Sequence, residues 1–532
     1  MPSTHSWDWV CRNRRYSEGV TNLPVASAAS SQGNEETLPI LCEAPAESSV
    51  PKTKNGRADQ VAQTLVVAVL FAVPALMCAH AAMVNDPDIW WHLRTGEWML
   101  AHHAVPRVDP YSGALAGSRW LAYSWVFELA AVKLYQWLGL VGIVAYTSVM
   151  ILAITVALFH LLRRLQIDFT LVVLLTFCAC YSMGRLYSPR PWLFTVLFFV
   201  LEMDILMQAR KTGRVRELLW LPLIFALWAN VHIQFIDGLL VLGLAWAETL
   251  AARWGVTSAS TRVQPKWMGL ALAGSLLATL VNPFGSRIYQ AAYELATQAG
   301  ALNKISELQA LPFRTTADYV VLLLALGSTA ALAWQRRSMP FETALLGLAA
   351  VLSFRSQRDV WVMAVVGVVI LASTIAGSEQ AAIRLPKLGT TIALLAAGLA
   401  MPVGFRMMQV NHARLATDLA KSLPVHAVET VRAKGYAGPL YNDYNWGGYL
   451  IWALRMPVSI DGRAAFYGDQ RLDRSMATWN AEPDWASDAQ LTQAGLVIGP
   501  VKAALTQVLR MDPRFQLVYE DKVAAVFVAR RK

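Results

Sequence analysis

The sequence predicts a multi-pass α-helical membrane protein with about eleven spans and a C-terminal α/β domain on the outer side of the membrane. Of its 532 residues, 55% are hydrophobic and only 15% are charged, whereas soluble proteins carry about 25% charged residues. Apolar stretches of roughly 17 to 24 residues recur along the chain, which is the length that a bilayer core demands of a helix. The formal net charge of +10 collects in alternate loops, so it orients the chain and does not indicate nucleic-acid binding.

Residues 1–60 are rich in Ser, Ala, Pro and Glu and lack apolar periodicity, which predicts a disordered cytoplasmic tail. The first apolar run begins near residue 61, too far from the start for a secretory signal peptide. We therefore interpret this run as a signal anchor. A wrongly assigned start codon would explain the tail equally well.

Eleven apolar stretches follow the tail, and together they form a predicted transmembrane domain over residues 61–406. They cover residues 62–84, 139–162, 169–187, 191–208, 218–234, 237–253, 267–284, 318–334, 340–355, 359–376 and 388–406. An odd number of spans places the two ends of this domain on opposite sides of the membrane. Every second loop is basic, for example at Arg163 and Arg164 and at Arg336 and Arg337, and the positive-inside rule then places the N-terminus in the cytoplasm.

This topology depends on one amphipathic segment. Residues 123–138 contain Glu128 and Lys133 between aromatic residues, which favours a helix lying in the outer interface. Counting that segment as a span would invert every later loop. The outer side then carries a first loop of about 85–138, a middle loop of about 285–317 and the region 407–532.

Residues 407–532 form a predicted soluble α/β domain. Short β-rich runs alternate there with helical stretches, so we expect three to five strands. The expected strands lie at residues 458–460, 495–498, 515–519 and 523–528. None of the five Cys residues falls in this region, so the domain has neither a disulfide framework nor a Cys-type zinc site.

Two carboxylates stand where the first span ends. Asp86 and Asp88 open the motif NDPDIWWHLRTGEW, and a carboxylate at this boundary is partly desolvated, which raises its pKa toward that of a useful general base. A structural reading competes for each. Asp88 precedes a helix and suits its N-cap, and Asp86 precedes Pro87, as turn residues often do.

Several motifs resemble those of one family. The motif DPDIWWHLRTGEW, together with RPWLF at 190–194, WANVH at 228–232, NPFG at 282–285, NWGGYLIW at 445–452 and IDGR at 460–463, resembles bacterial membrane glycosyltransferases of the GT-C superfamily. The resemblance implies transfer of a sugar from a polyprenyl-phosphate carrier on the outer face of the membrane. It also implies that an acidic residue of the first outer loop, Asp88 or Asp86, activates the acceptor. Here Asp-Pro-Asp-Ile-Trp-Trp replaces the usual acidic pair followed by aromatics, which leaves the choice between the two open.

The predicted topology places several polar residues at the outer ends of spans, where charge is costly unless it is paired or functional. We assign a substrate-binding group from these residues and from His92 of the first loop. The group comprises His92, Arg185, Arg190, Asn230, His232, Arg355 and Arg358. A guanidinium matches a lipid phosphate bidentately, so we expect Arg185, Arg190, Arg355 and Arg358 to line one cavity with Asn230 and His232. The alternative is that each Arg snorkels to headgroups or pairs with a nearby Asp.

Two further sets of residues have alternative readings. We expect no cofactor, although His92, His102 and His103 with the two aspartates are of the types that bind a divalent metal. Their spacing matches no metal motif. The aromatic residues of the C-terminal domain are either a sugar-stacking platform or core, and their helical spacing favours core. They are Trp446, Tyr449, Trp452 and Tyr467.

The resulting hypothesis is an inverting GT-C glycosyltransferase of the bacterial inner membrane. It would move a sugar from a polyprenyl-phosphate donor to a lipid, glycan or protein acceptor on the outer side, without binding nucleic acid. The alternative is a non-catalytic component of a polysaccharide or envelope assembly complex. A transporter is disfavoured, because no paired broken spans occur in matching halves and no charge is clearly placed at mid-membrane.

Overall fold

The computed structural model describes residues 56–166, 168–257, 261–298, 304–335, 338–375 and 386–530. Most of the predicted tail therefore lies outside the described residues. The first described helix, α1, begins at Gly56, inside the range assigned to that tail.

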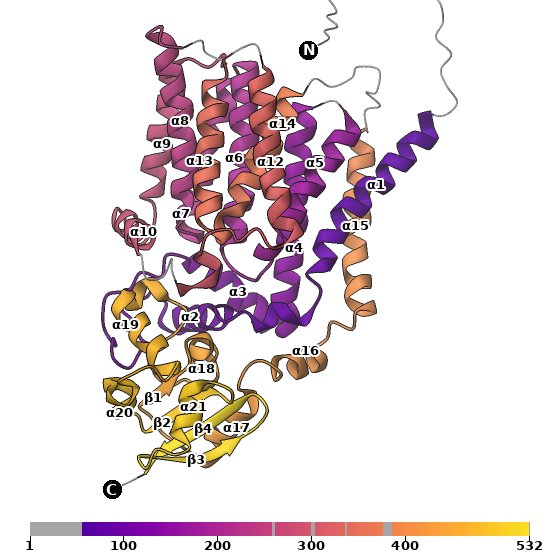
Figure 1. Cartoon of the computed structure of the whole chain (residues 1–532). Coiled ribbons are helices and arrows are strands. Elements are labelled where there is room, and N and C mark those ends of the chain that lie inside the picture. Colours follow the sequence, from indigo (N-terminus) through magenta and orange to yellow (C-terminus); the bar gives the residue numbers. More distant parts are fainter. Residues whose placement is uncertain are drawn as a thin grey trace, which may run out of the picture. The chain divides into compact units, whose positions relative to one another are not determined.

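All eleven predicted apolar stretches contain a helix (Figure 1). These helices are α1 (Gly56–Met77), α4 (Leu140–Leu165), α5 (Phe169–Ser182), α6 (Trp192–Thr212), α7 (Trp220–Val231), α8 (Phe235–Arg253), α9 (Pro265–Thr279), α12 (Thr316–Trp334), α13 (Pro340–Arg355), α14 (Val360–Thr374) and α15 (Lys387–Met407). Within the described residues, seven helices are long and apolar enough to cross a membrane: α1, α4, α6, α8, α12, α14 with its preceding turn, and α15. The length and apolar composition of these helices indicate a membrane protein.

The four remaining helices of this set are shorter than a bilayer core requires. They have 14, 12, 15 and 16 residues for α5, α7, α9 and α13, whereas a perpendicular span needs about 20 residues at 1.5 Å per residue. The count of eleven spans and its orientation therefore stay predictions.

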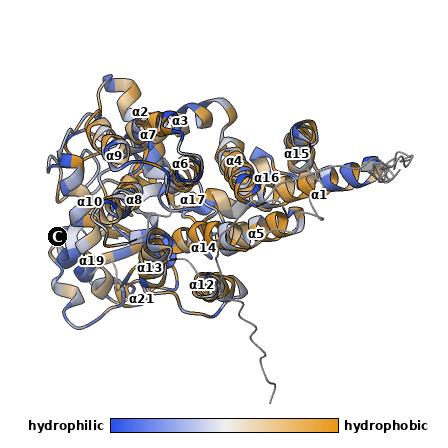
Figure 2. Cartoon of the chain, turned by 90° about the horizontal axis from the view of Figure 1, so that it is seen from above, coloured by the Kyte–Doolittle hydropathy of each residue, from blue (hydrophilic) through white to orange (hydrophobic). Residues whose placement is uncertain are grey.

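Helix α14 lies at the centre of the bundle. Nearly all of its residues are buried, from Val360 to Ile370 without interruption, and it packs against α4, α5, α6, α12 and α13. Helices α1 and α15 pair with each other at one edge, as the view along the bundle shows (Figure 2). Their faces are much less buried, as expected where lipid covers apolar side chains.

Two helices cross the end of this bundle, next to the C-terminal domain (Figure 1). They are α2 (Ile89–His102) and α3 (Trp125–Leu138). The predicted amphipathic helix at 123–138 is confirmed as a helix. Short 3-10 turns connect many of the elements, namely η1 (Ala81–Asn85), η2 (Gly184–Leu186), η3 (Val215–Leu219), η4 (Ser306–Leu308) and η5 (Gln357–Asp359), and α10 (Arg287–Thr297) lies in the middle loop.

A four-stranded mixed sheet forms the C-terminal domain. Its strands are β1 (Leu440–Asn442), β2 (Leu496–Pro500), β3 (Phe515–Glu520) and β4 (Ala524–Ala529), in the order β1-β2-β4-β3. Strand β1 runs parallel to β2, while β4 is antiparallel to both β2 and β3. The surrounding helices are α16 (His412–Leu419), α17 (Val425–Lys434), α18 (Gly447–Leu454), α19 (Ala464–Trp479), α20 (Ala489–Thr492) and α21 (Ala504–Leu509), with turns η7 (Tyr444–Trp446) and η8 (Trp485–Ser487).

The predicted strand at 458–460 is wrong. Val458 makes only an isolated bridge to Ser112 of the first loop. The strand at this edge of the sheet is β1, three residues long, which the alternation pattern did not single out. The preferred core reading of the domain aromatics is confirmed. Trp446, Tyr449 and Tyr467 are buried, and Trp90 of α2 contacts both Tyr449 and Trp452.

Candidate active site

A cavity of about 580 Å³ lies where the first loop, the bundle and the C-terminal domain meet. Asp88, His92, Arg190, His232 and Arg358 line it. Its remaining polar lining comes from residues that the sequence analysis did not assign to a site, among them Arg119, Glu128, Glu294, Glu307, Tyr444 and Arg463.

The two aspartates in the turn before α2 have different roles. Oδ1 of Asp86 accepts hydrogen bonds from the backbone N–H of Asp88 at 2.9 Å and of Ile89 at 3.2 Å. Asp88 occupies the N-cap position, but its side chain makes no capping hydrogen bond. The expected capping role therefore belongs to Asp86, and the carboxylate of Asp88 is left to face the cavity.

Arg190 ties three carboxylates together. Its Nε donates to Oδ2 of Asp86 at 2.7 Å, and its Nη1 lies 2.7 Å from Oδ2 of Asp88 and 3.2 Å from Oε1 of Glu307. Glu307 belongs to η4 in the middle loop, so three segments far apart in the sequence supply this cluster.

The environment of Asp88 suits a general base. Burial raises the pKa of Asp88 to about 7, with Arg190 opposing the rise and the carboxylates of Asp86 and Glu307 adding to it. Its side chain still keeps 15% exposure. A carboxylate with a pKa near the working pH is an efficient proton acceptor.

His92 is held by a second buried carboxyl group. Its Nδ1 lies 3.1 Å from Oε1 of Glu128 in α3. Burial lowers the pKa of His92 well below its usual value and raises that of Glu128 well above its usual value, so burial favours the neutral form of each group. His92 therefore lines the cavity as a neutral polar group.

Two glycines let the C-terminal domain approach this turn closely. A Cβ on Gly462 would overlap Oδ1 of Asp88, and a Cβ on Gly448 would overlap the carbonyl oxygen of Pro87. The motifs NWGGY and IDGR thus pack directly on the motif DPD. Only glycine leaves room for such contacts.

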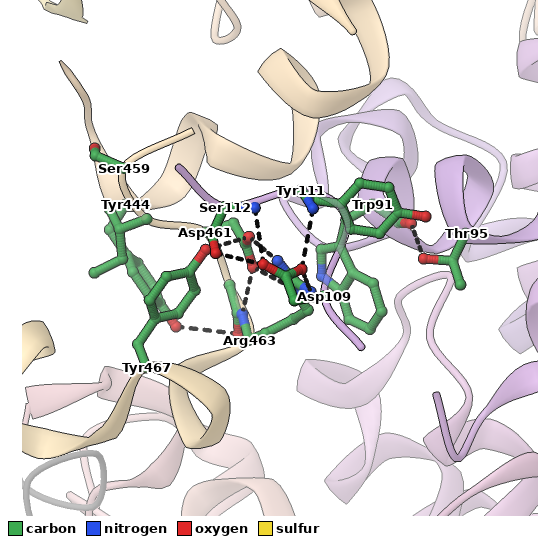
Figure 3. A network of polar contacts seen from close by, with 12 residues as sticks. Trp91, Thr95, Asp109, Tyr111, Ser112, Tyr444, Ser459, Asp461, Arg463 and Tyr467 are labelled. Carbon is green, nitrogen blue, oxygen red and sulfur yellow. Dashed lines mark hydrogen bonds and ion pairs between the residues drawn. The ribbon is translucent and has the colours of Figure 1, made fainter. Parts of the chain in front are cut away.

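Arg463 fastens the domain to the first loop (Figure 3). Its guanidinium lies 2.6 Å from Oδ2 of Asp461 and 2.7 Å from Oδ1 of Asp109, and all three side chains are almost completely buried. Asp109 also accepts a hydrogen bond from the backbone N–H of Ser112 at 2.8 Å, and Tyr467 donates to Asp461 at 2.7 Å. We name Asp109, Asp461 and Arg463 the latch.

Arg358 is a cavity guanidinium with spare donor capacity. It lies 5.2 Å from the ring of Trp192, on which Arg190 also packs at 4.7 Å. Its buried Nε has no hydrogen-bond partner among the described residues. A buried donor without a partner is costly, so this group is suited to an anionic ligand.

The other predicted substrate-binding residues do not all reach the cavity. Arg185 pairs with Asp318 and donates to Gln357 at 2.8 Å, and Arg355 donates to the carbonyl of Ala296 at 3.0 Å. Asn230 joins α7 to its neighbours through Trp125 and the carbonyl of Val281. These three residues lie outside the cavity lining, so the expected convergence of six residues on one cavity is wrong. Pairing with a nearby Asp, the alternative reading, describes Arg185.

His232 does line the cavity, and its Nδ1 lies 2.8 Å from Oγ1 of Thr195. The residues of the metal alternative are not gathered. His102 stacks on Trp98 at the end of α2, and His103 ends that helix with a positive φ. Within the described ranges, no group of three or more His, Cys, Asp or Glu side chains is arranged to hold a metal ion.

The sequence analysis did not consider one buried carboxyl group, that of Glu202. Glu202 lies in the middle of α6, is fully buried, and neither carboxylate oxygen has a hydrogen-bond partner among the described residues. This places a titratable side chain halfway along a helix long enough to cross a bilayer, which the sequence analysis did not note. Glu202 does not line the cavity.

Comparison with solved structures identifies the fold. The oligosaccharyltransferase of Archaeoglobus fulgidus, tethered to an acceptor peptide containing the NVT sequon, matches with a TM-score of 0.52 and 11% identity over 82% of this chain and 69% of that one. The archaeal oligosaccharyltransferase AglB from Archaeoglobus fulgidus, in complex with an inhibitory peptide and a dolichol-phosphate, matches with a TM-score of 0.52 and 11% identity over 85% and 70%. The chain has a GT-C fold.

The resemblance inferred from the motifs is thereby confirmed at the level of the fold. No protein-family model matches the sequence, and no curated protein matches it. The residues that the sequence analysis did not assign to the site are chiefly Glu307, Asp109 and Glu128. Asp109 stands in a second Asp-Pro pair, VDPYS, which was the one local signal available.

Proposed function

We propose that this GT-C protein transfers a sugar from a polyprenyl-phosphate donor to an acceptor bound in the cavity of about 580 Å³. The observation that carries the proposal is the placement of two groups in that cavity. Asp88 offers a carboxylate with a pKa of about 7, and Arg358 offers a guanidinium donor that lacks a partner among the described residues.

The reaction follows from these two groups. The acceptor's nucleophilic atom attacks the anomeric carbon and gives its proton to the carboxylate of Asp88, the general base. The bond between the anomeric carbon and the phosphate oxygen breaks on the opposite side, and its electron pair stays with the phosphate. Arg358 stabilises the charge that develops there. In-line displacement inverts the configuration at the anomeric carbon.

The solved neighbours support a lipid-phosphate carrier, since one of them was obtained with a dolichol-phosphate. Both were obtained with peptides, which favours a peptide among the lipid, glycan and protein acceptors considered. We place the protein in the bacterial inner membrane, as the resemblance of its motifs implies, and the basic loops put the cavity and the C-terminal domain on the outer side.

The proposal is tested with purified protein in lipid, given radiolabelled polyprenyl-phosphate sugars and a panel of peptide, lipid and glycan acceptors. Transfer of label to one acceptor class supports the enzyme. If no carrier supports transfer, while the protein pulls down envelope-assembly components through its C-terminal domain, the assembly-component reading replaces it.

The pH dependence of transfer should report Asp88. The base must be ionised to accept a proton, so kcat/KM should rise about tenfold per pH unit below a pKa of about 7 and level off above it. Measuring initial rates between pH 5 and 9 checks this. A rate that is flat across pH 7 would contradict the assignment.

Arg358→Gln should weaken carrier binding. The substitution removes a charge-assisted hydrogen bond, worth about 1.5–3 kcal/mol, so the Kd for the polyprenyl-phosphate should rise by about one to two orders of magnitude. Arg355→Gln is the matched control, because Arg355 comes from the same segment but lies outside the cavity lining. Equal effects of the two substitutions on Kd would argue against a phosphate site at Arg358.

A further inference from the structure

Three carboxylates surround one guanidinium beside the cavity. Asp86, Asp88 and Glu307 each place an oxygen within 3.2 Å of the same guanidinium, that of Arg190. Oxygen atoms of several carboxylates around one position are what Mg²⁺, Mn²⁺ or Ca²⁺ prefers. The position that would suit such a cation is filled by a side chain of the protein itself.

While Arg190 is in place, both carboxylate oxygens of Asp86 are engaged in hydrogen bonds. Its Oδ1 accepts two backbone hydrogen bonds at the start of α2, and its Oδ2 accepts from Nε of Arg190. Asp88 and Glu307 share Nη1 of the same guanidinium. A metal ion at this point would therefore have to expel Arg190, and the residues present do not fit one alongside it.

Arg190 is also held rigidly. Prolines flank it at 189 and 191 and restrict the backbone. Its carbonyl accepts a hydrogen bond from the hydroxyl of Tyr146 at 2.9 Å, and its guanidinium packs on Trp192 at 4.7 Å. The side chain is only 11% exposed. A cation fixed in this way needs no reorganisation when charge moves nearby.

One guanidinium does not neutralise three carboxylates. The contact with Arg190 fixes Asp88 in position. The cluster keeps excess negative charge when all three carboxylates are ionised, so Asp88 remains basic. A divalent ion would have cancelled more of that charge and made the carboxylate a weaker base.

We infer that Arg190 is the resident cation of this acidic site, taking the place that a divalent metal ion would occupy and positioning Asp88. The inference deepens the proposed function and rests on it for the role of Asp88. It changes the assignment of Arg190, which the sequence reading gave to the lipid phosphate. Arg190 is here a positioning residue.

Mn²⁺ binding, followed by electron paramagnetic resonance of the full-length protein in detergent, tests the inference without any transfer assay. Wild-type protein should show no Mn²⁺ site at the cluster. Arg190→Ala empties the position while leaving the three carboxylates, so it should gain one bound Mn²⁺ per protein, and Asp88→Asn or Glu307→Gln added to it should abolish the gain. Mn²⁺ should also raise the melting temperature of Arg190→Ala alone.

Two controls separate charge from mere loss of an arginine. Arg190→Lys keeps a positive charge at the cluster and should gain no Mn²⁺ site. Arg185→Ala removes an arginine that pairs with one carboxylate, Asp318, outside the cavity, and it should not gain a site either.

A Mn²⁺ site in the wild-type protein that Asp88→Asn or Glu307→Gln removes would overturn the inference, and this measurement needs no arginine variant. A folded Arg190→Ala protein that binds no Mn²⁺ would also overturn it. Neither outcome depends on sugar transfer, so a failure here is distinguishable from a failure of the proposed function.

Discussion

Asp88→Asn should reduce sugar transfer by about 10²–10⁴-fold, the usual contribution of a positioned general base. The substitution keeps the size of the side chain but cannot accept the acceptor's proton. The helix behind it should survive, because Asp86 and not Asp88 caps α2. Initial rates with a radiolabelled donor, measured at pH 8, check the loss.

Glu97→Gln is the matched control for that experiment. Glu97 is a carboxylate of the same helix, paired with Arg94 at 3.0 Å and lying outside the cavity lining, so its loss should leave the rate within about twofold. Full transfer by Asp88→Asn, with the protein normally folded, would show that this carboxylate is not the base.

Arg463→Ala should destabilise the contact between the C-terminal domain and the first loop by about 3–5 kcal/mol. Removing one member of a buried ion pair leaves the other charges without compensation, and the latch leaves two carboxylates, Asp109 and Asp461, in that state. Urea unfolding in detergent, followed by tryptophan fluorescence, measures the change.

Arg474→Ala provides the comparison within the same domain. Arg474 pairs with Asp488 at 3.1 Å but is 39% exposed, so its loss should cost no more than about 1 kcal/mol. If Arg463→Ala costs as little as Arg474→Ala, the latch does not hold the domain in place.

The helices were predictable because each one forms from a local run of apolar residues, whose length and composition are visible in the sequence. Helix α14 is an example, since its run from Val360 to Ile370 is both continuous in the sequence and buried in the structure. Strand β1 was not predictable. Three residues are too few for an alternating pattern, and β1 is a strand only because β2 pairs with it from more than fifty residues away.

The candidate site was predictable only where its chemistry was local. Asp86 and Asp88 stand in one motif, yet their roles depend on which carboxylate reaches the backbone of α2. Glu307 and Asp109 carried no local signal of equal strength, because each acquires its role from an arginine in another segment. In the sequence, Arg185 and Arg355 could not be distinguished from Arg358. Only the packing of the folded chain shows that Arg358 lines the cavity and the other two do not.

The latch also sets an order of events during synthesis of the chain. Asp109 and Arg463 are 354 residues apart, which at about 5–20 residues per second means an interval of roughly 20–70 s between their emergence from the ribosome. Throughout this interval the turn that carries Asp88 lacks the glycines that pack on it. The acidic cluster can form early, because its residues come from the first loop, the bundle and the middle loop. The glycines of the C-terminal domain that pack on it are synthesised late. A chain still being made therefore holds the acidic cluster without a closed cavity, and on the proposed function transfer would begin only after the C-terminal domain has folded.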